Sequence, residues 1–147
     1  MKIAIGSDHG GFALKERLLE YLKEHGYEVN DCGTYTKDSC HYPEIAKKVA
    51  TEVKEDRADK GVLCCGTGIG MSMAANKVKG IRAALVSDAF SAKYTRLHND
   101  ANIICMGERT IGPGLAEMLL EIFLTTDFEG GRHKVRVDMI RDIESEN

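Results

Sequence analysis

The segment Leu63–Ser72, LCCGTGIGMS, places two adjacent cysteines before three glycines at alternate positions. A glycine loop that opens a helix leaves backbone N–H groups free, and such groups favour a bound anion and a thiolate. Strand side chains alternate between faces, so Cys64 and Cys65 should point apart, with Cys65 facing the loop. A thiolate there suits acyl transfer as a nucleophile, or proton abstraction beside a carbonyl as a base. A buried cysteine before a structural turn is the other interpretation.

The same glycines do not fit the common nucleotide-binding loops. Gly66, Gly68 and Gly70 follow the third apolar run, whereas a dinucleotide fingerprint follows the first strand and has an acidic residue about 20 positions later. A P-loop would end in Gly-Lys-Ser or Gly-Lys-Thr, which is absent here. No further Cys or His lies at zinc-ligand spacing from Cys64 and Cys65. We therefore expect neither a metal nor a cofactor.

Short apolar runs alternate with amphipathic segments along the whole chain. Strands are predicted at 2–6, 27–33, 60–66, 81–88 and 101–107. Helices are predicted at 12–26, 43–56, 70–78, 89–98, 114–126 and 132–146. Strands that are apolar on both faces and followed by helices are typical of a parallel sheet covered on both sides. The pattern predicts one α/β domain over residues 1–147, a three-layer α/β/α Rossmann-like fold with a five-stranded parallel sheet.

Polar residues follow several of these strands directly. Asp8 and His9 come after the first strand, Thr67 after the third and Arg109 after the fifth. In open parallel sheets, ligands bind beyond the carboxyl ends of the strands. We therefore expect these side chains to share one site with Cys65.

Three further candidates lie at or near helix ends. His98 ends a predicted helix, where a histidine serves either as a cap or as a catalytic group, and the sequence favours neither. Arg132 and Arg136 are four residues apart on one helical face. Such a pair is usually a solvated face, but beside an anion site it would bind a phosphate.

The composition narrows the class of protein. The chain is 43% hydrophobic and 29% charged, with a net charge of −3, which argues against a nucleic-acid partner. No apolar run reaches the roughly 20 residues that cross a bilayer, and no signal peptide opens the sequence, so we expect no membrane association and a cytoplasmic location. An odd set of five cysteines without C-x-x-C argues against a disulfide framework. Cys32, Cys64 and Cys105 are expected to be small buried residues.

The last predicted helix, at about 131–145, has little sheet left to cover. Its apolar positions Val137, Ile140 and Ile143 are expected to pack on a neighbouring subunit.

Five segments together resemble one known family. GSDHGGF, YP, CGTGIGMSMAANKVKGIRAAL, HNDANIICMGER and EGGRHKVRV occur in the order found in ribose-5-phosphate isomerase type B, a family that includes galactose-6-phosphate isomerase subunits. The resemblance runs from Met1 to about Ile143. It implies a metal-free aldose–ketose isomerase of the pentose phosphate pathway that interconverts ribose 5-phosphate and ribulose 5-phosphate.

The resemblance also implies roles for individual residues. Cys65 would move the C2 proton to C1, while Thr67 and the backbone of Gly66, Gly68 and Gly70 would steady the enediolate. His98 and Asp8 would help to open the furanose ring, and Asn99 would hold a sugar oxygen. Tyr42 would line the sugar pocket. The phosphate would be held by His9, Arg109, Arg132 and Arg136.

The resemblance further implies a homodimer, or a dimer of two such dimers, in which His98 of one subunit faces Cys65 of the other. Some family members use a glutamate base a few residues after the cysteine position, where this chain has Met73 and Ala74, so the thiol branch fits. His41 stands where relatives often carry an acidic residue.

Two alternative functions remain open at this stage. One is the isomerisation of a six-carbon aldose phosphate, such as allose 6-phosphate or galactose 6-phosphate. The other is a phosphosugar-binding protein without catalysis.

Overall fold

Five short strands form one sheet in which every neighbouring pair is parallel. The computed structural model describes residues 1–147, and the strand order is β2-β1-β3-β5-β4. The central strand β3 pairs with β1 on one side and β5 on the other. The strands are β1 (Lys2–Ser7), β2 (Glu28–Asp31), β3 (Lys60–Cys65), β4 (Ala83–Leu85) and β5 (Ile103–Gly107).

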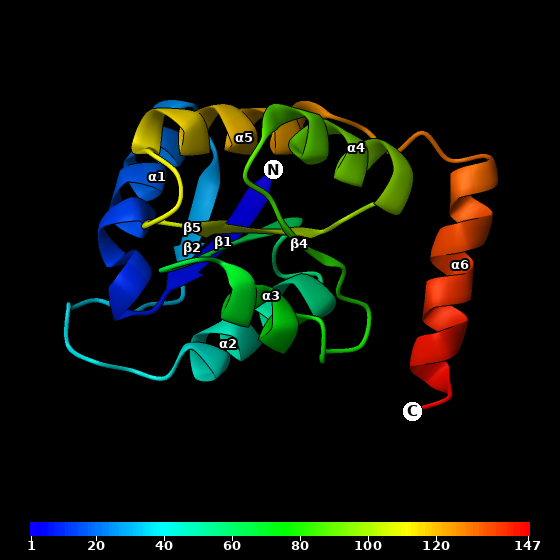
Figure 1. The fold of residues 1–147 in the computed structure, drawn as a ribbon, viewed down its shortest axis with the longest axis horizontal. Helices are drawn as coiled ribbons and strands as arrows, with labels where there is room; N and C mark the ends of the chain where they lie inside the picture. Colours follow the sequence, from blue (N-terminus) through cyan, green and yellow to red (C-terminus); the bar gives the residue numbers. More distant parts are fainter.

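Helices cover both faces of this sheet, which confirms the predicted three-layer α/β/α fold. In Figure 1, α4 and α5 lie above the sheet, α1 lies at its left, and α2 and α3 lie below it. The buried side of α1 shares its core with α5. A short 3-10 turn, η1 (His9–Gly11), joins β1 to α1. The helices are α1 (Phe12–Glu24), α2 (Tyr42–Lys54), α3 (Ile69–Ala75), α4 (Ala89–Asn99), α5 (Pro113–Thr125) and α6 (Arg132–Ser145).

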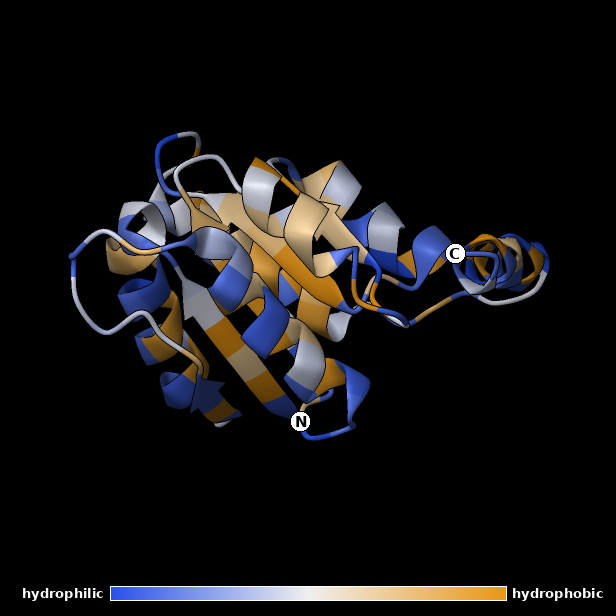
Figure 2. Cartoon of the chain, turned by 90° about the horizontal axis from the view of Figure 1, so that it is seen from below, coloured by the Kyte–Doolittle hydropathy of each residue, from blue (hydrophilic) through white to orange (hydrophobic).

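Each face of the sheet has its own hydrophobic core. Leu14, Leu18 and Leu22 of α1 are buried with Cys64 on one face. The apolar residues of α2 are buried with Cys65 on the opposite face. Figure 2 shows the apolar strands enclosed between helices that are polar on their outer sides. The prediction that Cys64 and Cys65 point to opposite faces is confirmed.

The strands farthest from the centre are shorter than the sequence pattern predicts. β2 covers only Glu28–Asp31, and β4 covers only Ala83–Leu85. Both are edge strands, so each has one neighbour to extend its ladder. Cys32 follows β2 and is half-buried, which differs from the predicted burial, whereas Cys64 and Cys105 are fully buried. All five cysteines are free thiols.

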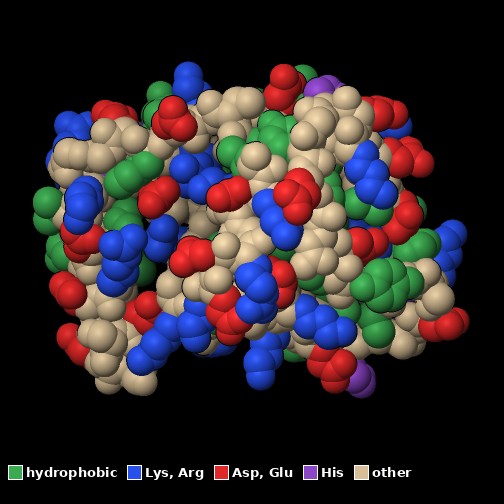
Figure 3. All heavy atoms as spheres, turned by 180° about the vertical axis from the view of Figure 1, so that it is seen from behind, with side chains coloured by type: hydrophobic (Ala, Val, Ile, Leu, Met, Phe, Trp, Pro, Cys, Tyr) green, Lys and Arg blue, Asp and Glu red, His purple; other side chains and the backbone are tan.

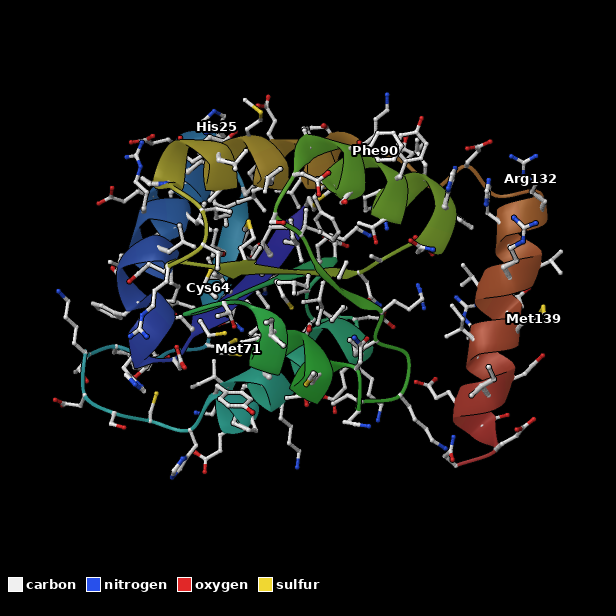
Figure 4. The ribbon with its side chains drawn as sticks, viewed as in Figure 1. His25, Cys64, Met71, Phe90, Arg132 and Met139 are labelled. Carbon is white, nitrogen blue, oxygen red and sulfur yellow. The ribbon has the colours of Figure 1, made fainter.

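Helix α6 stands apart from the layered body at the right of Figure 1. It contacts the chain through α4, and the carboxylate of Glu144 accepts a hydrogen bond from Gly80 N–H at 3.0 Å. Val137 is buried in its own chain, so the prediction that this residue packs on another subunit is wrong. Ile140 and Ile143 are exposed, and Met139 lies on the outer side of the helix (Figure 4).

Charges of both signs are mixed over the surface. In the view from behind, Lys and Arg side chains alternate with Asp and Glu, and no extended basic face appears (Figure 3). None of the helices combines the length and the apolar character that spanning a membrane requires.

Glycine lets the loop after β1 lie directly against β3. A Cβ atom at Gly11 would lie 2.5 Å from the carbonyl carbon of Cys64, closer than real contacts allow. The Gly11 N–H donates to Asp8 Oδ1 at 3.1 Å, which holds the turn in place. This close approach brings the residues after β1 next to the end of β3.

We predict that Gly11→Ala lowers the free energy of unfolding by roughly 1–3 kcal/mol, because the added methyl group must displace the β3 backbone. The matched control is Gly114→Ala in α5, where the added Cβ meets no atom within 4 Å. Alanine there should leave stability unchanged or raise it slightly, since it is the better helix former. Urea denaturation of both variants measures the difference, and equal midpoints would contradict the close approach.

Candidate active site at the carboxyl edge of the sheet

Cys65 ends the central strand with its sulfur turned into a glycine loop. The residue is 6% exposed, and its Sγ accepts a hydrogen bond from Gly68 N–H at 3.0 Å. Gly68 has φ +79°, in the left-handed region that favours glycine. A backbone donor aimed at a sulfur stabilises the thiolate form more than the neutral thiol. The predicted relation between Cys65 and the loop is therefore present in the structure.

Two further backbone donors of this loop have no acceptor within the chain. The N–H groups of Gly66 and Thr67 make neither backbone nor side-chain hydrogen bonds. The Arg109 side chain lies over the loop, since a Cβ added at Gly66 would lie 3.5 Å from Arg109 Cδ. Arg109 N–H also donates to Gly66 O at 3.0 Å, which joins the end of β5 to the loop. Free N–H groups beside a guanidinium favour a negatively charged oxygen next to Cys65.

Cys64 has the opposite environment. It is fully buried in the core under α1 and α5. Burial raises the pKa of its thiol strongly, and the neighbouring Cys65 acts in the same direction. Cys64 is therefore a packing residue, and Cys65 is the reactive candidate of the pair.

The turn after β1 brings an acid and an imidazole to the same edge. Asp8 N–H donates to Cys64 O at 3.3 Å, so this turn lies directly beside the end of β3. His9 is exposed, and its Nδ1 accepts a hydrogen bond from Cys40 N–H at 3.3 Å. In the neutral ring this bond leaves Nε2 as the donor, free to meet an anion.

Tyr42 comes to the site from the first turn of α2. A Cβ at Gly70 would lie 2.7 Å from a carbon of the Tyr42 ring, so the ring lies on the first turn of α3. The preceding His41 is exposed and its side chain makes no capping hydrogen bond to α2. The structure thus gathers most of the predicted residues at one edge of the sheet: Asp8, His9, Tyr42, Cys65, Gly66, Thr67, Gly68, Gly70 and Arg109.

The remaining predicted residues lie at the other end of the strands, beside their amino ends. α4 starts beyond the carboxyl end of β4 and runs back to the start of β5, so His98 and Asn99 lie near the amino ends of the strands. Arg132 and Arg136 follow on α6, and Figure 4 shows Arg132 far from Cys64. From Gly61 to Cys65, β3 alone separates the two edges by roughly 13 Å at about 3.3 Å per residue. One chain therefore does not bring His98 to Cys65.

This second group contains two residues that the sequence did not single out for a role. The rings of His98 and His133 stack with centroids 3.9 Å apart and planes at 10°. Glu129 Oε2 lies 3.8 Å from His98 Nε2 and 3.9 Å from His133 Nε2. Burial lowers the pKa of His133, and the neighbouring His98 acts in the same direction. The sequence indicated this cluster only through the four-residue spacing of Glu129 and His133. His98 is distant along the chain, so no spacing relates it to the other two.

Together, the two groups hold complementary chemistry. The carboxyl edge offers a thiol among backbone N–H donors and a guanidinium, which suits proton transfer through an oxyanion. The group around His98 offers imidazoles and guanidiniums, which suit proton transfer to oxygen and phosphate binding.

The chain is similar over nearly its whole length to known sugar-phosphate isomerases. A family model described as Ribose/Galactose Isomerase matches residues 3–140. The chain is 49% identical to ribose-5-P isomerase B of Listeria innocua over 147 residues, covering 100% of this chain and 99% of that protein. It is 46% identical to ribose-5-phosphate isomerase B of Escherichia coli over 143 residues, covering 97% and 96%. Among solved structures, Clostridium thermocellum ribose-5-phosphate isomerase B superposes with a TM-score of 0.99 at 49% identity, covering 99% of both chains.

Proposed function

Because this chain belongs to the ribose/galactose isomerase family, we propose that it interconverts ribose 5-phosphate and ribulose 5-phosphate with Cys65 as the base. The observation that carries the proposal is the environment of the Cys65 sulfur. Gly68 N–H donates to this sulfur at 3.0 Å, and the neighbouring N–H groups of Gly66 and Thr67 have no acceptor within the chain. Such a site stabilises a thiolate before the reaction and an oxyanion during it.

The proton transfer follows from this arrangement. The Cys65 thiolate removes the proton from C2 of the open-chain aldose, and the electron pair forms a C1–C2 double bond with negative charge on O1. Donors from Thr67 and the loop backbone stabilise this enediolate. The Cys65 thiol then returns the proton to C1, the O2 proton passes to O1, and the ketose results. Tyr42, on the first turn of α3, lines the sugar pocket.

Ring opening and phosphate binding need the second group of residues. A base must take the O1 proton of the furanose while an acid protonates the ring oxygen, and Asp8 and His98 fill these roles. Asn99 holds a sugar oxygen. The phosphate is bound by His9 and Arg109 at the carboxyl edge together with Arg132 and Arg136 from α6.

Since His98 lies at the far edge of its own sheet, we propose a homodimer in which each subunit completes the other's site. The exposed apolar side chains of α6, including Met139, Ile140 and Ile143, support a subunit contact there. A hollow of about 860 Å³ also separates α6 from the β4 edge, with Ile81 and Asn99 in its lining. A two-fold axis would place a second copy against these surfaces and create two equal sites. Two such dimers can further associate.

The family also suggests a second substrate class, since its description includes galactose isomerases. Six-carbon aldose phosphates share the phosphate, the C1 aldehyde and the C2 proton, and differ in chain length. The five free thiols support a reducing, cytoplasmic location for either activity.

The proposed substrate is tested with a panel of aldose phosphates of five and six carbons. We expect ribose 5-phosphate to give the highest kcat/KM for ketose formation, and we expect this activity to persist with a chelator present. A higher kcat/KM for allose 6-phosphate or galactose 6-phosphate would assign the six-carbon function instead. If no aldose phosphate of the panel were converted to a ketose, the assignment as an aldose–ketose isomerase would be contradicted.

The two adjacent cysteines provide a matched pair of variants. Cys65→Ala should lower kcat by at least about 10²-fold while phosphosugar binding persists, because a positioned acid–base group contributes roughly 10²–10⁴. Cys64→Ala should reduce stability through a packing defect and leave kcat nearly unchanged. Equal loss of kcat in both folded variants would contradict the assignment of the base.

The shared site is tested by exchanging subunits between two inactive variants. Cys65→Ala and His98→Ala dimers are mixed and allowed to exchange, so that about half of the dimers become hybrids. Each hybrid has one site with both lesions and one intact site, so about a quarter of wild-type activity should return. Native mass spectrometry checks the exchange. Complete exchange without recovery would mean that both residues serve the site of one subunit.

A further inference from the structure

Two histidines and a glutamate from separate parts of the chain meet beside α6. His98 comes from the last turn of α4, Glu129 from the segment before α6, and His133 from the first turn of α6. One nitrogen or oxygen from each side chain lies within 4.8 Å of those of the other two. Two imidazoles and a carboxylate are a common set of three protein ligands for zinc.

One nitrogen of the His133 ring lacks a hydrogen-bond partner. Its side chain is 5% exposed, and Nε2 is buried without a hydrogen bond. Buried polar atoms are normally satisfied, so an orphaned ring nitrogen is an exception that needs a cause. This nitrogen lies 3.9 Å from Glu129 Oε2, too far for a hydrogen bond and far enough for an ion to enter between them.

We propose that His98, Glu129 and His133 bind a divalent transition-metal ion of the Zn²⁺ type, with the fourth position open to water. Two imidazole ligands favour zinc and its neighbours over Mg²⁺ and Ca²⁺, which prefer sets of oxygen ligands. The ion is a regulator of the site and takes no part in the proton transfer at Cys65.

Binding requires the side chains of His98 and Glu129 to turn toward His133. Tetrahedral zinc with bonds of about 2.0–2.1 Å places its ligand atoms about 3.4 Å apart. The glutamate oxygen is already 3.8 Å and 3.9 Å from the two ring nitrogens. The stacked rings must open so that both Nε2 atoms face one point. The side chains of His98 and Glu129 are 36% and 53% exposed, so they have more room to turn than that of His133, which is 5% exposed.

A bound ion should inhibit the isomerase, and this consequence rests on the proposed function. A bound ion occupies the imidazole lone pair of His98, and this is the group that moves protons during ring opening. Zinc should therefore block the conversion of ribose 5-phosphate, and a chelator should restore it.

Metal binding is measured without reference to activity, in a Cys65→Ser background that removes the competing thiolate. Co²⁺ and Zn²⁺ are titrated into this variant by absorption spectroscopy and calorimetry. We expect one ion per subunit and no sulfur-to-cobalt charge-transfer band. Adding Glu129→Gln should weaken binding at least about tenfold, since even an outer-shell change costs 10–100-fold. Adding Asp127→Asn, which removes a carboxylate two residues away, should leave affinity unchanged.

The proposal is overturned if the Cys65→Ser protein shows no saturable binding, or if Glu129→Gln and Asp127→Asn bind alike. Zinc inhibition is measured in parallel with Cys65 intact. Glu129→Gln should raise the zinc concentration for half-inhibition at least about tenfold, and equal inhibition of wild type and variant would place the inhibitory ion elsewhere. If the wild-type protein converted no aldose phosphate while the Cys65→Ser variants bound metal as expected, the proposed function would be contradicted and the metal site would stand.

Discussion

The hydrogen bond from Gly68 N–H to Cys65 Sγ is the interaction on which the rest of the site depends. It requires a left-handed residue three positions after the cysteine, which glycine adopts without strain. It also requires a strand that ends with Cys65 on the α2 and α3 face, and the alternation along β3 provides this. The flanking strands then complete the site. β1 delivers Asp8 and β5 delivers Arg109 to the same edge, through backbone bonds to Cys64 and Gly66.

A second constraint comes from the direction of the chain in a parallel sheet. A helix that links two parallel strands begins at the carboxyl edge and ends at the amino edge. His98 ends α4, so the connection itself moves this residue away from Cys65 of the same chain. The separation is a property of the topology and does not change with side-chain rotamers. In the proposed homodimer, a second copy packed against the exposed apolar residues of α6 would bring His98 of one subunit to Cys65 of the other. In the proposed homodimer, the cluster of His98, Glu129 and His133 would lie on the half of the site that one chain contributes to its partner.

Much of this could be predicted from local patterns. The burial of Leu14, Leu18 and Leu22, and the opposite faces of Cys64 and Cys65, follow from helical and strand periodicity. The grouping of strand-end residues follows from the sheet being parallel. Other features depend on contacts between distant segments. Val137 packs in its own chain because α6 leans on α4, and no periodicity shows that. The stack of His98 on His133 joins residues 35 positions apart, which the amphipathic pattern does not relate. The short β4 reflects its place at an edge, which the apolar run at 81–88 does not reveal.

The central claim is that the Cys65 sulfur carries a proton between two carbon atoms of the sugar. Hydrogen exchange with solvent tests it most directly. Ribose 5-phosphate is incubated with the protein in D₂O, and ¹H and ²H NMR follow C2 of the aldose and C1 of the ketose. The account predicts deuterium at both positions with the wild-type protein, since a thiol exchanges its proton with solvent. With folded Cys65→Ala that still binds the sugar phosphate, it predicts no incorporation above the uncatalysed rate. Incorporation by that variant at the wild-type rate would contradict the account, because another group would then be the base.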